Sequence, residues 1–259
     1  MQDLRVTLIQ ADLVWQQPEA NRTQFEQIFA ELEGTTDLIV LPEMFTTGFT
    51  MAPETLAEPI DGETARWLKQ QAEHLDAAIV GSVVTQVGDH YRNRCFFTQP
   101  NGEQTVYDKR HLFRMGGEHN HYEAGRERVV VEYKGWRIMP QICYDLRFPA
   151  FSRNHNEYDL LIYVANWPKP RRNPWRTLLQ ARAIENQSYV AGVNRVGIDG
   201  SGLAYSGDSL LVDFMGERLV DQVPDQAFVE TFTLDALALN DFRERFPAWM
   251  DADAFDLKL

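Results

Sequence analysis

Short apolar runs, each about the length of one β-strand, recur along the 259-residue chain and constrain its fold more than any other feature. Residues 38–41 and 160–165 are such runs, and residues 4–10 are expected to form an alternating strand with Val6 and Leu8 on one face. Helices are predicted over residues 18–33 and 62–75, the first with a stripe of apolar side chains at helical spacing. Strands that alternate with helices are typical of α/β folds, in which neighbouring strands pair in parallel.

Hairpin signals dominate the middle and the end of the chain. A Pro-Asn-Gly turn at residues 100–102 separates two expected strands, and a Lys-Gly turn at 134–135 separates two more. One further helix is predicted over residues 174–186, and the segment 209–233 is again rich in strands. This is more strand than one sheet holds comfortably, so we expect two mixed sheets packed face to face with helices outside, a four-layer α/β/β/α sandwich. No repeat or change of composition marks a linker, and residues 1–259 are expected to form a single domain.

The charge balance of the chain is strongly acidic. There are 38 Asp and Glu residues against 25 Lys and Arg residues, which gives a formal net charge of −13. Binding to nucleic acid or to an anionic membrane requires a basic surface, so neither partner is expected, and no apolar run is long enough to span a membrane. The chain begins with a strand rather than a secretory signal, and its two cysteines make no disulfide framework. We therefore expect a cytoplasmic protein.

Three of the expected strands end abruptly in a reactive residue: Glu43, Lys109 or Cys143. Ligands of open α/β sheets lie outside the carboxyl ends of the strands, so these three side chains can converge. Each also has a simpler interpretation, namely a surface cap for Glu43, a solvated turn for Lys109 and a buried structural thiol for Cys143. If Cys143 is reactive, exposed backbone N–H groups at its turn are expected to lower the pKa of the thiol and to bind an oxyanion.

Three segments resemble, in order and spacing, the signature segments of the nitrilase superfamily of carbon–nitrogen hydrolases. They are residues 41–45 (LPEMF), 107–113 (YDKRHLF) and 142–149 (ICYDLRFP). Residues 182–187 (RAIENQ) look like that family's helix after the nucleophile, and residues 206–209 (SGDS) continue the match. The resemblance therefore runs along nearly the whole chain, and it implies the same α/β/β/α fold.

The roles that this resemblance implies agree with the chemistry of amide hydrolysis. Cys143 would attack the amide carbon, Glu43 would accept the thiol proton as general base, and Lys109 would stabilise the oxyanion. Many members of the family add a second glutamate between the lysine and the cysteine. Glu118 matches this residue by its distance from the following glycine, and Glu123 is the competing candidate.

The segment after the nucleophile bears on the substrate. Residues 143–149 look most like the omega-amidase group, which deamidates 2-oxoglutaramate and 2-oxosuccinamate, so the implied activity is release of ammonia from a small carboxylated amide through a cysteine thioester. In that group the arginine at the position of Arg147 is taken to hold the substrate's α-carboxylate, a task that suits a guanidinium, and Tyr144 is a second candidate for substrate binding. The alternative role for Arg147 is a structural salt bridge to Asp145 or to another carboxylate. A nitrilase, an N-carbamoyl amide hydrolase and a non-catalytic reactive-thiol protein remain as alternative functions.

Metal and cofactor sites are not expected. His111, His119 and His121 have acidic neighbours, but no His or Cys spacing in the chain matches a zinc site. No Gly-rich phosphate loop follows a strand, so the sequence predicts no nucleotide cofactor either.

The resemblance also has an implication for assembly, because family members commonly pair through the helix after the nucleophile. The helix near Trp175 and the tail residues Trp249, Phe255 and Leu257 carry more large apolar surface than a monomer usually exposes. A homodimer is therefore expected.

Overall fold

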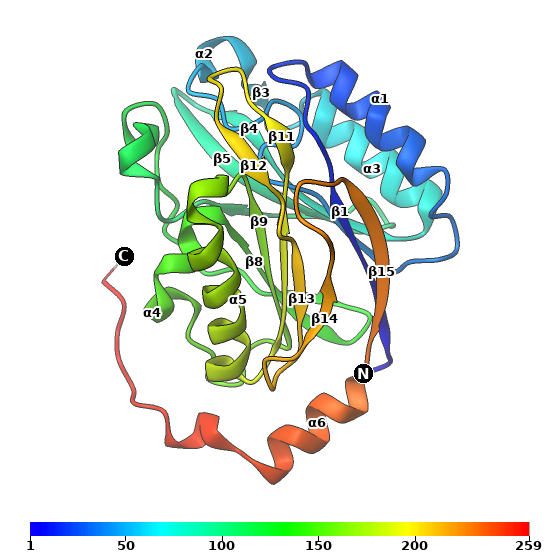
Figure 1. Cartoon of the computed structure of the whole chain (residues 1–259), viewed down its shortest axis with the longest axis vertical. Coiled ribbons are helices and arrows are strands. Elements are labelled where there is room, and N and C mark those ends of the chain that lie inside the picture. The colour runs from blue at the N-terminus through cyan, green and yellow to red at the C-terminus, as the bar shows by residue number, and fades with distance from the viewer. Residues whose placement is uncertain (259) are drawn as a thin grey trace.

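The computed structural model describes residues 1–258 and places two mixed β-sheets face to face. Figure 1 shows α1 and α3 together on one side of the molecule and α5 on the other, so the sheets form the two inner layers and the helices the outer ones. The prediction of an α/β/β/α sandwich is confirmed.

The first sheet has seven strands in the order β15-β1-β2-β4-β5-β6, with β3 beside β4. Its centre is parallel, because β1, β2 and β4 pair in the same direction, whereas β15, β5 and β6 extend it as antiparallel strands. The strands are β1 (Leu4–Gln10), β2 (Leu38–Val40), β3 (Glu58–Pro59), β4 (Ala78–Val87), β5 (His90–Thr98), β6 (Gln104–Asp108) and β15 (Phe228–Leu234).

The second sheet has six strands in the order β14-β13-β10-β9-β8-β7. Here too the central strands β8, β9 and β10 are parallel, and the outer strands are antiparallel. The strands are β7 (Val131–Tyr133), β8 (Trp136–Ile142), β9 (Leu160–Ala165), β10 (Tyr189–Asn194), β13 (Leu210–Val212) and β14 (Arg218–Asp221). A separate hairpin of β11 (Val196–Ile198) and β12 (Ala204–Ser206) was not predicted from the sequence.

The helices connect these strands, and their bounds lie close to the predicted ones. Among residues 1–258, none of the helices has the length and apolar character needed to cross a membrane. The α-helices are α1 (Pro18–Phe29), α2 (Pro53–Leu56), α3 (Glu63–Leu75), α4 (Pro149–Ser152), α5 (Arg172–Asn186) and α6 (Ala236–Arg245). Short 3-10 turns are η1 (Arg114–Gly116), η2 (Glu118–Asn120), η3 (Cys143–Arg147), η4 (Lys169–Arg171) and η5 (Ala248–Asp251).

Alternation along the strands of the first sheet divides the core into two layers. Val6 and Leu8 of β1 belong to the apolar cluster between the sheets, together with Ile138 of β8. Ile9, which points the other way, belongs to the cluster with Phe25 of α1. Because successive side chains of a strand face opposite sides, a strand buried on both faces reads as a continuous apolar run.

Helix α5 packs closely on the second sheet through Trp175, Leu179 and Ala183, which are spaced four residues apart and fully buried. Gly192 of β10 allows this approach, since a Cβ there would lie 2.4 Å from a methyl carbon of Leu179. The apolar surface expected on this helix is not at Trp175, although Ile184 of the same helix is exposed. The Trp175 indole is in the core, and its N–H donates to the Asp208 carbonyl at 2.7 Å.

Candidate active site

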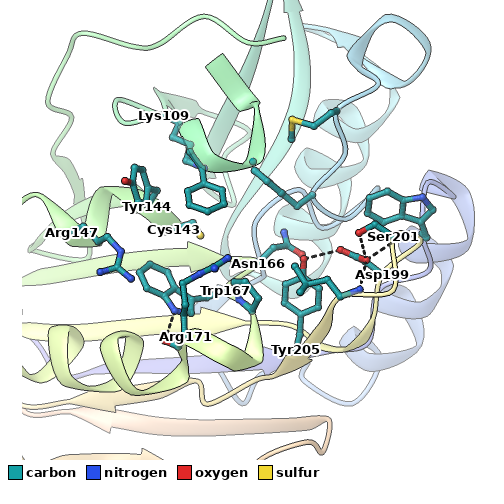
Figure 2. Close-up of a pocket in the computed structure, with 17 residues that line it drawn as sticks. Lys109, Cys143, Tyr144, Arg147, Asn166, Trp167, Arg171, Asp199, Ser201 and Tyr205 are labelled. Atoms are coloured by element: carbon teal, nitrogen blue, oxygen red, sulfur yellow. Dashed lines mark hydrogen bonds between the residues drawn. The ribbon is translucent and has the colours of Figure 1, made fainter. Parts of the chain in front are cut away.

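Four side chains that follow buried strands meet at one edge of the sandwich. Glu43 lies after β2, Lys109 after β6, Cys143 after β8 and Asn166 after β9. Lys109, Cys143 and Asn166 line a cavity of about 320 Å³, and Figure 2 shows Cys143 inside it, with Arg147 to one side and Asp199 to the other. Large apolar and aromatic side chains form much of the wall, among them Trp15, Phe49, Phe113, Trp167, Leu203 and Tyr205.

A fully buried cluster of one lysine and two carboxylates lies against this cavity. Lys109 Nζ donates to Glu43 Oε1 at 2.8 Å and to Glu118 Oε1 at 3.0 Å. Asn93 of β5 donates to the same two oxygens, at 2.8 and 3.2 Å. Burial alone would lower the pKa of Lys109, but the charges of Glu118 and Glu43 outweigh it and hold this pKa above its ordinary value. Lys109 therefore stays charged.

The protonation of Glu118 depends on the charges of Glu43 and Lys109 beside it. Burial raises the pKa of Glu118 above its ordinary value, and the charge of Glu43 adds to the rise while Lys109 opposes it. The second oxygen of Glu118 accepts the Phe113 N–H at 2.5 Å. Every polar group that contacts the Glu118 carboxylate is thus a donor, which fixes its orientation.

The Glu43 carboxylate is also held from both sides. Its Oε2 accepts the backbone N–H of Asn166 at 2.8 Å, and the Asn166 side chain donates back to the Glu43 carbonyl. The next residue, Met44, has a φ of 42°, so the chain turns sharply just after the carboxylate. Glu43 is therefore fixed between the ends of β2 and β9.

Cys143 also stands at a sharp backbone turn, with a φ of 44°, and its side chain borders the cavity although the residue is only 8% exposed. Burial raises the pKa of the thiol well above its ordinary value, and the charge of Glu43 raises it further. Lys109 and the Asn166 backbone N–H act in the opposite direction but do not outweigh these effects. The expectation of a lowered pKa is wrong, and Cys143 rests as a neutral thiol that needs a base before it can attack.

Asp145 joins the Cys143 turn to the Lys109 loop. Its two oxygens accept the Ile142 N–H at 3.0 Å, the Tyr107 hydroxyl at 2.7 Å and the His111 N–H at 2.9 Å. The His111 ring also bonds to Asp145 at 2.7 Å. These contacts use the carboxylate fully, so the alternative of a structural salt bridge between Arg147 and Asp145 is not what the structure has.

Arg147 and Tyr144 both line the cavity next to Cys143. The guanidinium of Arg147 lies 4.9 Å from the centre of the Trp167 ring, and it forms no ion pair with a carboxylate in the described part of the chain. Tyr144 packs edge-on against Phe113 at 5.1 Å. A half-buried cation that stacks on an indole but has no carboxylate partner in the described part of the chain is therefore available to a ligand in the cavity.

The other candidate residues lie elsewhere. Glu123 accepts from Arg92 at 2.6 Å and is half exposed, so Glu118 and not Glu123 is the glutamate at Lys109. His121 lies 3.9 Å from Glu54, whereas His111 contacts Asp145, so these two histidines have different carboxylate partners. Within residues 1–258, no three His, Cys, Asp or Glu side chains are grouped as metal ligands.

Several residues of the site were not predicted, although one of them carried a usable signal. Asn166 stands directly after the apolar strand β9, just as Glu43 and Cys143 stand after theirs. Asn93 gives no such signal, because it lies inside a strand between two arginines. The hairpin of β11 and β12 supplies Asp199 and Tyr205 to the cavity wall.

Comparison with known proteins identifies the class of the chain. Residues 5–238 match the family model of the carbon–nitrogen hydrolases. The protein belongs to the carbon–nitrogen hydrolase family, and the resemblance to the nitrilase superfamily seen in the motifs is confirmed.

Three individual proteins show which members of this family the chain resembles. Omega-amidase YafV of Escherichia coli K12 is 50% identical over 261 residues, which cover 99% of this chain and 100% of that protein. The 2-oxoglutaramate amidase of Bacillus subtilis is 32% identical over 95% of this chain and 96% of its own length. Among solved structures, XC1258 from Xanthomonas campestris, a CN-hydrolase superfamily protein with an arsenic adduct in its active site, matches with a TM-score of 0.96 and 49% identity, covering 99% of this chain and 100% of that one.

Proposed function

We propose that the protein is an omega-amidase, which hydrolyses the terminal amide of a small 2-oxo acid such as 2-oxoglutaramate or 2-oxosuccinamate and releases ammonia. The observation that carries this proposal is the cavity, in which the Cys143 thiol, the Lys109 cluster and the unpaired Arg147 guanidinium face one small volume of about 320 Å³. A cavity of this size suits a five-carbon substrate, and the names of the relatives support the same activity.

The proposed reaction proceeds through a thioester. Glu43 accepts the proton of Cys143 as the sulfur attacks the amide carbon, and Lys109 with the Tyr144 backbone N–H stabilises the oxyanion. Glu43 then passes the proton to the leaving nitrogen, so ammonia departs and the acyl group remains on Cys143. A water molecule activated by Glu43 hydrolyses the thioester and restores the thiol. The raised pKa of Cys143 supports this assignment, because a neutral thiol requires a nearby base.

Glu118 belongs to the proposed catalytic set because it holds Lys109, and a matched pair of substitutions tests this. In Glu118→Gln the amide NH2 would have to face either the Phe113 N–H or the donors Lys109 and Asn93. The cluster would therefore lose one negative charge and at least one hydrogen bond. We expect kcat/KM to fall about 100-fold. Glu123→Gln removes a carboxylate in the same segment and should leave kcat/KM unchanged; equal effects of the two substitutions would remove Glu118 from the set.

Arg147 is proposed to hold the α-carboxylate, with Tyr144 forming the neighbouring wall. In Arg147→Met, kcat/KM for 2-oxo acid ω-amides should fall by about 30-fold or more, since a charge-assisted bidentate contact is worth on the order of 2 kcal/mol. Activity toward a small uncharged amide should fall much less, because Glu43, Lys109 and Cys143 remain. Equal losses on charged and uncharged amides would make Arg147 a scaffold residue.

A substrate panel tests the activity itself. Ammonia release should be fastest from 2-oxoglutaramate or 2-oxosuccinamate, slower from the monoamides without the oxo group, and absent from nitriles and ω-carbamoyl acids. Preferred turnover of a nitrile would indicate a nitrilase, and carbon dioxide released with ammonia would indicate a carbamoyl hydrolase. If no compound of the panel is turned over, the reactive-thiol alternative stands.

Three further proposals concern the whole molecule. We infer that residues 1–259 form one carbon–nitrogen hydrolase domain, which the family match over residues 5–238 supports. A cytoplasmic location is supported by the two free cysteines, Cys95 and Cys143.

A homodimer is supported by exposed apolar side chains on α5 and in the C-terminal segment. Light scattering at micromolar concentration should give twice the 29.9 kDa mass of the chain. The exposed residues are Ile184, Phe246, Met250 and Phe255.

A further inference from the structure

Arg171 is a second pocket cation that neither the sequence motifs nor the proposed mechanism uses. It ends the turn η4 and lines the same cavity as Cys143, with its guanidinium carbon 5.3 Å from the centre of the Phe113 ring. Its side chain pairs with no carboxylate among residues 1–258. The cations beside it are different, because Lys169 pairs with Asp225 at 2.8 Å and Arg172 pairs with Asp208 at 2.6 Å.

The backbone that carries Arg171 is rigid. Pro168 and Pro170 each fix one φ angle of the turn, and the Arg171 N–H donates to the Pro168 carbonyl at 2.9 Å. The Arg171 carbonyl in turn accepts the indole N–H of Trp167 at 2.7 Å. Trp167 is also the ring over which Arg147 stacks, so one indole contacts both arginines. In Figure 2 Arg147, Trp167 and Arg171 lie along one side of the cavity, next to Cys143.

No carboxylate of the cavity wall forms an ion pair with either of these two guanidinium groups in the described part of the chain. Lys109 is neutralised by its two buried glutamates. The carboxylate of Asp199 is satisfied within its own hairpin, by the Ser201 backbone and hydroxyl, the Leu203 N–H and the Tyr205 hydroxyl. In a protein of net charge −13, two guanidinium groups that line one cavity and pair with no carboxylate form a local site for an anion.

We propose that Arg171 is a specificity-determining residue, which together with Arg147 binds the 2-oxo-carboxylate end of the substrate and excludes substrates that carry an α-ammonium group. A carboxylate and its neighbouring oxo group present three acceptor oxygens, more than a single guanidinium fork can pair in one plane. L-glutamine carries the same α-carboxylate, but an α-ammonium group stands where 2-oxoglutaramate has its oxo oxygen. A guanidinium group placed to donate to that oxygen would face a positive charge instead. The inference rests on the proposed function and deepens it.

The experiment compares Arg171→Gln with Lys169→Gln, which removes one positive charge from the same turn but from outside the cavity. The two variants and the unmodified protein are assayed on 2-oxoglutaramate, on glutaramate, which lacks the oxo group, and on L-glutamine. In Arg171→Gln, kcat/KM for 2-oxoglutaramate should fall about 10- to 100-fold, mainly through KM. The loss should be smaller for glutaramate, and the preference for 2-oxoglutaramate over L-glutamine should shrink by at least about tenfold. Lys169→Gln should stay within about twofold of the unmodified protein.

Calorimetric titration of 2-oxoglutarate into Cys143→Ala, and into the same protein with Arg171→Gln added, measures the site without turnover. The second substitution should weaken binding by the same 10- to 100-fold. Arg171→Lys, which keeps the charge but not the fork, should bind with intermediate strength.

The outcomes separate this inference from the function on which it rests. If the unmodified protein turns over none of the ω-amides, the proposed function fails. If it is active but Arg171→Gln behaves like Lys169→Gln on all three substrates, the specificity role of Arg171 is overturned. An equal loss on every substrate, together with a lowered Tm, would also overturn it and would make Arg171 a structural residue.

Discussion

Cys143→Ala is expected to abolish ammonia release, lowering kcat by about 10⁴-fold or more, while the protein folds normally. The side chain that would attack the amide carbon is gone, and Glu43 cannot replace it because its carboxylate is held by Lys109, Asn93 and Asn166. Quenched reactions of the unmodified protein should give a peptide containing Cys143 with the mass of the acyl group added. Substantial turnover by Cys143→Ala would end the thioester mechanism.

Cys95 provides the matched control for this substitution. It is the other free cysteine, and it is fully buried in β5 within the core between the two sheets. Cys95→Ala removes one buried sulfur atom and should lower the free energy of unfolding by about 1–2 kcal/mol, while the activity of the folded fraction stays the same. Loss of activity without loss of folding in Cys95→Ala would show that thiol chemistry is not confined to Cys143.

Lys109→Arg should be nearly as inactive as Lys109→Met, with kcat reduced by about 100- to 1,000-fold in both variants. The Lys109 ammonium is only 1% exposed and lies within 3.0 Å of two carboxylates, so a larger planar guanidinium cannot occupy the same point. Rates close to those of the unmodified protein in Lys109→Arg would show that only a distant positive charge is needed.

The stability of Lys109→Met tests how much the buried ammonium group contributes to folding. Lys109→Met leaves Glu43 and Glu118 buried without their cation, which should lower the free energy of unfolding by about 3–5 kcal/mol. Lys134→Arg, on a half-buried lysine that pairs with Asp37 at 2.6 Å, should affect neither activity nor stability and controls for the exchange itself. A Lys109→Met protein as stable as the unmodified one would mean that one of the two glutamates takes up a proton.

The strands that the sequence predicted well are those buried on both faces. β1 and β9 match their predicted bounds, β9 because it is a continuous apolar run and β1 because apolar and polar side chains alternate along it. The hairpin of β11 and β12 was missed, because each strand has three residues and glycines interrupt the pattern. What holds β11 is tertiary: the Val196 N–H donates to the Ala11 carbonyl at 3.0 Å, and Gly197 lies directly against Asp12, contacts between segments that local periodicity cannot reveal.

The motifs predicted which residues at the strand ends belong to the site, but not the contacts and burial of those residues. Glu43 and Lys109 lie on the same side of the first sheet because β2 and β6 run in the same direction. Cys143 follows a strand of the second sheet and Glu118 lies in the turn η2, so their meeting with Glu43 and Lys109 depends on how the two sheets and the loops pack. The direction of the Cys143 pKa could not be predicted from local sequence, since it depends on burial and on the distant Glu43. In the sequence Arg171 is one of several cations in its segment. Only the structure distinguishes it, because its neighbours Lys169 and Arg172 form ion pairs with Asp225 and Asp208.

Two residues of the site have a left-handed backbone conformation, which lowers the stability of the fold while it positions the reactive groups. Met44 and Cys143, with φ angles of 42° and 44°, adopt a backbone conformation that is about 1–2 kcal/mol less favourable for a residue with a Cβ than for glycine. At position 143 the residue that the backbone favours has no thiol, so the nucleophile is retained at the expense of stability. Stabilising variants of this fold should therefore be sought away from these two turns, because a substitution that relaxes either backbone would also change the direction of the Glu43 carboxylate or of the Cys143 thiol.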